Sequence, residues 1–146
     1  MILELGLALK KGGIINPALL YHLGQLGHGD IFVVSDAGLP IPSGVVRLDF
    51  AIRPGLPGFV EVVNAILSEG LAVERAVLAV EIKERSPLMH EKVLELLAAH
   101  GIGGDKITYV PHERFKAEFV AKAKFVVRTG EYTPYANVAF VSGVPF

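Results

Sequence analysis

Strand-like and helix-like segments alternate along the chain. The run IFVVS at 31–35 is apolar up to its last residue and shows no polar alternation, which is typical of a strand buried on both faces. Further segments rich in Val, Ile and Phe predict strands at 45–50, 75–82, 106–110, 125–128 and 138–143.

Four helices are predicted, one before the first strand and three between later strands, from apolar residues spaced by three or four positions. The first begins with Asn16 as the capping residue and Pro17 at the first helical position, and Gly27 ends it. Ser86 and Pro87 repeat this start for the third helix. The four helices cover 17–26, 57–66, 88–100 and 112–122.

This alternation predicts a single α/β domain over residues 1–146, a three-layer α/β/α arrangement around a mostly buried sheet of about six strands. The length suits one domain. Hydrophobic residues make up 51% of the chain and charged residues only 20%, which is more apolar than a lone small domain requires. We therefore expect other subunits to cover part of the surface.

Charge and composition narrow the classes of partner. Lys and Arg together number 14, and Asp and Glu 15, so no strong field favours nucleic acid or an anionic membrane. The absence of cysteine excludes disulfides and thiolate catalysis and fits a reducing cytoplasm. No apolar run approaches the roughly 20 residues of a membrane-spanning helix. We expect a soluble cytoplasmic protein that takes a small neutral ligand.

Polar residues that can carry chemistry flank the predicted strand at 31–35. Asp36 follows its carboxyl end, where ligands bind in open α/β sheets. His28 precedes the strand, and histidine can donate or accept a proton near neutral pH. Both have a structural alternative, because Asp36 lies in the turn-forming sequence DAGLP and a histidine beside glycine is often a capping residue. His112 either binds a ligand or only begins a helix.

The sequence gives little support for a metal site or a cofactor site. His28, Asp30 and Asp36 are possible metal donors, but their spacing matches no strong metal template. The segments KKGG and LPGF form no phosphate-binding or dinucleotide fingerprint, so we expect no cofactor. The polar loop RTGEYTPYAN at 128–137 is a better candidate for function, because long loops in compact domains often carry it.

Several short motifs occur in order along nearly the whole chain: LGHGD, SDAGLPIP, RPGLPGF, EIK, HERFK, RTGEYTPYAN and the terminal GVPF. With these motifs the chain resembles the D-ribose pyranase family from Gly13 to Phe146, and its GHGD element is similar to bacterial fucose mutarotases. The resemblance implies an enzyme that interconverts the pyranose and furanose forms of D-ribose without a metal or an organic cofactor. It also makes residues 1–12 an N-terminal extension.

The same resemblance implies a cytoplasmic, ring-shaped homo-oligomer, typically a homodecamer of two pentamers, with sites near subunit boundaries. It makes His28 the catalytic proton donor. The residues that it implies for sugar binding are Asp36, His112, Lys116, Tyr135, Ala136 and Asn137. These residue types suit ring opening, which needs a proton removed from the anomeric hydroxyl and one delivered to the ring oxygen. Asp36 would either orient the proton transfer or accept a hydrogen bond from a sugar hydroxyl.

Three alternatives stay open on the sequence alone. The protein could be a mutarotase that acts on fucose or another sugar, which an activity panel over several sugars distinguishes. It could be a ribose-binding accessory protein without turnover, whose binding would survive His28→Ala. A purely structural ring-forming protein would bind no sugar at all.

Overall fold

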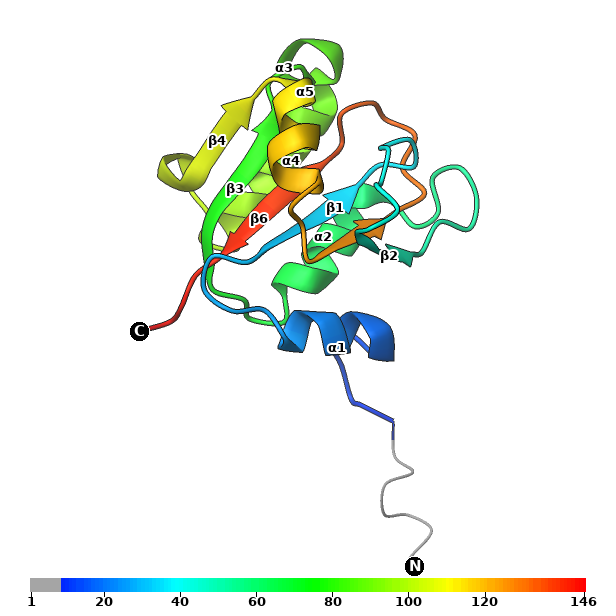
Figure 1. Cartoon of the computed structure of the whole chain (residues 1–146), viewed down its shortest axis with the longest axis vertical. Helices are drawn as coiled ribbons and strands as arrows, with labels where there is room; N and C mark the ends of the chain where they lie inside the picture. The colour runs from blue at the N-terminus through cyan, green and yellow to red at the C-terminus, as the bar shows by residue number, and fades with distance from the viewer. Residues whose placement is uncertain (1–8) are drawn as a thin grey trace, which may run out of the picture.

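The computed structural model describes residues 9–146, which form one mixed sheet with helices on both of its faces (Figure 1). The strands are β1 (Ile31–Ser35), β2 (Val46–Asp49), β3 (Val73–Ala79), β4 (Ile107–Val110), β5 (Phe125–Arg128) and β6 (Val138–Ser142). The helical segments are α1 (Pro17–Gly24), α2 (Phe59–Leu67), α3 (Ile82–Arg85), α4 (Pro87–Ala99), the 3-10 turn η2 (Gly104–Lys106), α5 (His112–Arg114) and the π-helix η3 (Phe115–Val120). Of the predicted N-terminal extension, residues 1–8 lie outside the described residues.

The strand directions determine which loops meet. The order in the sheet is β2-β5-β1-β6-β3-β4, and β6 runs antiparallel to both of its neighbours while every other pair is parallel. The carboxyl ends of β1 to β5 therefore lie side by side, together with the amino end of β6. We call this line of strand ends, which runs across all six strands, one edge of the sheet. This edge collects loops that are far apart in the sequence.

Two hydrophobic clusters hold the three layers together. On one face α1, α2 and α4 cover Phe32, Phe125 and Phe140, and the rings of Phe32 and Phe125 stack with centroids 5.2 Å apart. On the other face Phe115 and Phe119 of η3 pack on the small and branched residues of the sheet. The predicted α/β/α arrangement of a single sheet is confirmed. No helix of the described residues is long and apolar enough to cross a membrane.

The N-terminal helix begins as predicted. The N–H of Leu19 donates to the side-chain oxygen of Asn16 at 2.9 Å, and Pro17 occupies the first turn. The helix is shorter than predicted, because it ends at Gly24 rather than near Gly27.

Ser86 has a different role from the predicted one. It stands directly before α4, but its hydroxyl makes no capping bond and donates instead to the carbonyl oxygen of Pro134 at 2.6 Å. Ser86 therefore ties the start of α4 to the loop at 128–137. A contact between residues 48 positions apart cannot be read from local sequence.

The third strand was predicted at 75–82, but β3 starts two residues earlier, at Val73, and also ends earlier. β3 ends at Ala79, and Ile82 begins the short helix α3, where its side chain is buried in the core. A short segment rich in apolar residues does not distinguish a strand from the start of a buried helix, which explains the error. The helix predicted at 112–122 is also divided, since the regular turn α5 passes into the π-helix η3, which ends at Val120.

The loop at 128–137 is packed tightly against the loop that precedes α2. Gly130 donates to the carbonyl oxygen of Pro57 at 2.9 Å and accepts from the N–H of Gly55 at 2.6 Å. A Cβ atom at Gly130 would lie 2.4 Å from the carbonyl oxygen of Leu56 and 2.6 Å from that of Arg53. Only glycine allows this approach of two backbones.

We therefore expect Gly130→Ala to lower the free energy of unfolding by about 1–3 kcal/mol, the usual cost of forcing extra atoms into a packed region. The measurement is the urea midpoint of the variant against wild type. Gly44→Ala is the matched control, because a Cβ there meets nothing within 4 Å. Equal midpoints for the two variants would contradict the tight packing of this loop.

Candidate sugar-binding site

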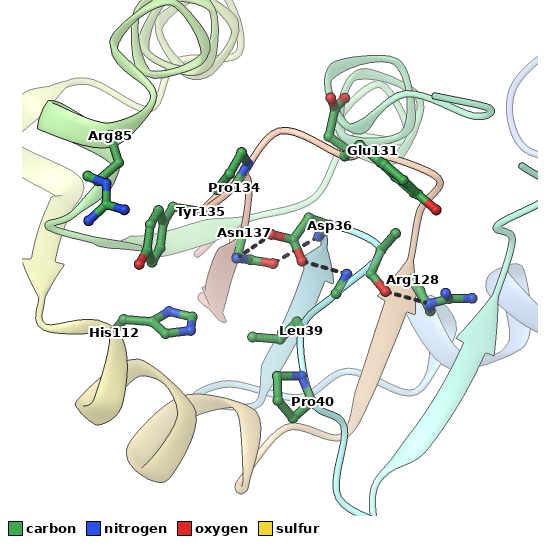
Figure 2. A pocket seen from close by; sticks show the side chains of 13 residues that line it. Asp36, Leu39, Pro40, Arg85, His112, Arg128, Glu131, Pro134, Tyr135 and Asn137 are labelled. Carbon is green, nitrogen blue, oxygen red and sulfur yellow. Dashed lines mark hydrogen bonds between the residues drawn. The ribbon is translucent and has the colours of Figure 1, made fainter. Parts of the chain in front are cut away.

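A cavity of about 520 Å³ opens at the edge where the strand ends meet (Figure 2). It is formed by the segments that follow β1, β3, β4 and β5, the last of which leads into β6. Its lining residues are Asp36, Ala37, Gly38, Leu39, Pro40, Arg85, His112, Arg128, Glu131, Tyr132, Pro134, Tyr135 and Asn137.

Asp36 and Asn137 form the floor of this cavity. The N–H of Asp36 donates to the side-chain oxygen of Asn137 at 2.8 Å, and the amide nitrogen of Asn137 donates to the Asp36 carboxylate at 3.3 Å. The two residues meet because β1 ends where the antiparallel β6 begins. Asn137 is almost completely buried, so the pair is held rigidly.

Asp36 also forms the predicted turn, since its carboxylate accepts from the N–H of Gly38 at 3.0 Å. Burial raises the pKa of Asp36 above its ordinary value of 3.8. The backbone N–H groups of Gly38 and Leu39, the amide of Asn137 and the nearby His112 act in the opposite direction without cancelling the effect of burial on the pKa. The result is a more basic carboxylate facing the cavity.

His112 faces Asp36 across the cavity (Figure 2). It follows β4, and its backbone N–H donates to both carboxylate oxygens of Glu81, at 3.0 and 3.1 Å. Its ring packs edge-on against Tyr135, with centroids 5.1 Å apart, and parallel to Phe115. Within the part of the chain that the structure describes, its buried Nδ1 atom has no hydrogen-bond partner. The ring of His112 is one of the polar groups that line the cavity.

The segment before β6 places Tyr135 beside His112 in an unusual backbone conformation. Tyr135 has a φ of +64°, the one positive value among the described non-glycine residues. Such strain is found at binding sites, where the surrounding structure compensates for it. Ala136 is fully buried in the core next to Tyr135, so its side chain belongs to the packing that fixes this segment.

Three of the predicted site residues do not line the cavity: the buried Ala136, Lys116 and His28. Lys116 pairs with Glu113 at 2.8 Å and lines a neighbouring hollow that shares Pro40 with the cavity. His28 lies at the opposite edge of the sheet, before β1, where its Nε2 atom is 3.5 Å from a carboxylate oxygen of Glu74. One chain therefore brings together Asp36, His112, Tyr135 and Asn137, but not His28.

Several charged residues of the cavity were not predicted individually. Arg128 donates to the carbonyl oxygen of Ala37 at 3.0 Å and to both oxygens of Asp49 at 3.1 Å, which fixes the loop after β1. Glu131 points away from Asp36 in Figure 2 and accepts from the N–H of Phe59 at 3.0 Å, at the start of α2. Both lie in the loop at 128–137, so its polar composition was a usable signal.

Arg85 gave no such signal. It ends the short helix α3, of which only Ile82 lay within a predicted strand, and no motif pointed to it. Among residues 9–146, no group of three or more His, Asp or Glu side chains is placed to hold a metal ion. The cavity instead offers a carboxylate, an imidazole, an amide and a phenol, the groups that bind sugar hydroxyls.

Comparison with known proteins shows the family of this chain. The family model described as the RbsD / FucU transport protein family matches residues 9–145. The chain belongs to this family. A D-ribose pyranase of Symbiobacterium thermophilum is 49% identical over 138 residues, which are 94% of this chain and all of that protein. A D-ribose pyranase of Salmonella newport is 43% identical over 141 residues, again 94% of this chain and all of the relative.

Solved structures of the RbsD / FucU family have the same fold. The structure of Bacillus subtilis RbsD complexed with D-ribose superposes with a TM-score of 0.84 at 41% identity, covering 94% of this chain and 99% of that one. A fucose mutarotase of Streptococcus pneumoniae in complex with L-fucose gives a TM-score of 0.74 at 28% identity, covering 90% and 95%. The family thus includes structures solved with two different monosaccharides.

The pKa of Asp36 can be tested directly. In a ¹³C NMR titration, we expect its carboxyl group to titrate above 3.8 in the wild type. Asn137→Ala removes a hydrogen bond that lowers this pKa, so it should move the midpoint higher still. A midpoint at or below 3.8 in the wild type, or a lower midpoint in the variant, would show that burial does not dominate the pKa of Asp36.

The raised pKa of Asp36 determines how its contribution to the stability of the fold changes with pH. Because the folded protein binds this proton more tightly than the unfolded chain, the contribution of Asp36 is fully present below pH 3.8. It is lost as the pH rises through the raised pKa of the folded state.

Proposed function

We propose that this protein is a D-ribose pyranase, an isomerase that interconverts the pyranose and furanose forms of D-ribose. The observation that carries the proposal is the cavity of Asp36, His112, Tyr135 and Asn137. It is supported by the relatives named D-ribose pyranase and by the Bacillus subtilis structure with D-ribose. The binding residues are Asp36, His112, Lys116, Tyr135, Ala136 and Asn137, and Ala136 contributes through its backbone.

The reaction needs one acid and one base. As the bond between the anomeric carbon and the ring oxygen breaks, the ring oxygen takes a proton from His28, and the anomeric hydroxyl gives its proton to Asp36. The open-chain aldehyde then recloses through a different hydroxyl, whose proton returns to His28 while Asp36 returns its own. No proton is gained or lost overall, and no redox step is involved. Such a pair supplies about 10²–10⁴-fold acceleration.

The positions of His28 and Asp36 require two copies of the chain at each site. They lie at opposite ends of β1, whose five residues at about 3.3 Å each separate the strand ends by roughly 15 Å. One sugar cannot reach both residues of the same chain. We therefore propose that His28 of one subunit completes the cavity of its neighbour.

A contact between opposite edges of two copies is head-to-tail, and head-to-tail contacts close into rings when the rotation between subunits allows it. This favours the ring-shaped homo-oligomer, with a homodecamer as the proposed size. Exposed apolar residues are available for such contacts, since Ile52 is 75% exposed, Leu88 72% and Phe146 99%. We place the protein in the cytoplasm, because a chain without cysteine forms no disulfides and therefore fits a reducing compartment.

The function is tested by saturation-transfer NMR on D-ribose. Inverting a β-pyranose anomeric resonance should transfer magnetisation to the furanose resonances in the presence of wild type. His28→Ala should reduce this enzyme-dependent exchange by about 10²-fold or more, because it removes the acid. No enhancement by folded wild type would refute the pyranase proposal. The same experiment on L-fucose, galactose and glucose tests the alternative that a fucose mutarotase relative suggests.

Mixed assemblies test the shared site. His28→Ala and His112→Ala chains should each be inactive alone, one without the acid and one without a binding group. Co-expressed, they should recover activity at roughly a quarter of the sites, where an intact His28 faces an intact cavity. Mixed assemblies as inactive as their parents, with subunit exchange shown by mass spectrometry, would contradict the shared site.

A further inference from the structure

His28 lies in a second hollow, at the edge of the sheet opposite to the sugar cavity. This hollow has a volume of about 560 Å³, and the titratable residues that line it are His28, Glu74, His100 and Lys106. Figure 1 shows the loop before β1 reaching the start of β3 and the end of β6 at this edge. The hollow is therefore where a neighbouring copy would meet His28.

The backbone on both sides of His28 is fixed. Gly29 donates to the carbonyl oxygen of Ser142 at 2.8 Å, and the N–H of Ser142 donates to the carbonyl oxygen of Asp30 at 2.8 Å. The Asp30 carboxylate in turn accepts from the N–H of Gly27 at 2.8 Å. With the backbone held in this way, the position of the imidazole depends mainly on its own side-chain torsions and on whatever contacts the ring.

Glu74 makes that contact. It is the second residue of β3, and its Oε1 atom lies 3.5 Å from Nε2 of His28. Both side chains are more than half exposed, so the pair adds little to stability. A carboxylate beside one imidazole nitrogen has a chemical effect instead, because it keeps the hydrogen on that nitrogen and fixes the orientation of the ring. Hydrogen bonds of this kind often shorten only when substrate is bound.

We propose that Glu74 is a positioning residue that holds Nε2–H of His28, so that Nδ1 is the atom that exchanges the proton with the sugar. This inference rests on the proposed role of His28 as proton donor and adds the residue that orients it. During ring opening the proton leaves Nδ1 for the ring oxygen, and Nε2 keeps its hydrogen on the Glu74 carboxylate. During reclosure Nδ1 takes the proton of the attacking hydroxyl.

Ribose exchange kinetics test the positioning role. Glu74→Ala should lower kcat by about tenfold or more while KM stays within about twofold, because a disordered acid impairs the proton transfer and not the binding of sugar. Glu74→Gln should recover most of kcat, since its amide oxygen accepts the same N–H bond. Glu95→Ala is the matched control, which removes an exposed glutamate from α4. In a His28→Ala background, Glu74→Ala should have no further effect.

A second readout does not depend on activity. In ¹⁵N NMR spectra, neutral His28 should carry its hydrogen on Nε2 in wild type and in Glu74→Gln, and Glu74→Ala should give a mixture of tautomers. Wild-type kcat in Glu74→Ala, or an unchanged tautomer in that variant, would overturn the positioning role. If His28→Ala keeps full activity, the catalytic assignment of His28 fails instead. The tautomer of His28 in wild type and in the Glu74 variants still reports whether Glu74 holds the ring.

Discussion

The antiparallel pairing of β6 with β1 is the constraint on which the cavity depends. Because β6 runs against its neighbours, the segment that precedes it lies at the same edge as the ends of the parallel strands. Asn137 can then bond both the backbone and the carboxylate of Asp36, although 101 positions separate the two residues. A β6 parallel to β1 would place Tyr135 and Asn137 at the opposite edge, and the cavity would lose its floor.

The remaining charged groups around the cavity mainly hold this arrangement in place. Arg128 joins the loop after β1 to Asp49, at the end of β2, and Glu131 bonds the first turn of α2. Gly130 allows the backbone of the loop at 128–137 to lie close to the backbone of the loop before α2. These structural bonds occupy the charges of Arg128 and Glu131. They leave the carboxylate of Asp36 and the imidazole of His112 lining the cavity.

The placement of His28 connects the proposed chemistry with the proposed assembly. A strand of five residues keeps the acid away from the cavity of its own chain, so catalysis would require a neighbour. The free chain would then be inactive, which would confine ring opening to the assembled protein. The high apolar fraction of the sequence agrees with subunit contacts of this kind, since apolar surface is costly to leave in water.

The sequence by itself determined the fold class and most of the elements. The buried runs and the Asn16 and Pro17 helix start are local signals, and they predicted the sheet, the first helix and the polar loop at 128–137. The family motifs in this loop and in DAGLP also pointed to Asp36, Tyr135 and Asn137. Only the tertiary structure decided which of these candidates share a cavity.

That decision rests on strand direction and on contacts between distant residues, neither of which has a local signature. The structure separated His28 from Asp36, placed Lys116 in an adjoining hollow, and gave Ser86 a partner in the loop before β6. It also brought Arg85 to the cavity by ending β3 at Ala79 and turning the chain into α3. Periodicity predicts which face of an element is buried, whereas the neighbours of that face depend on how the whole sheet is ordered.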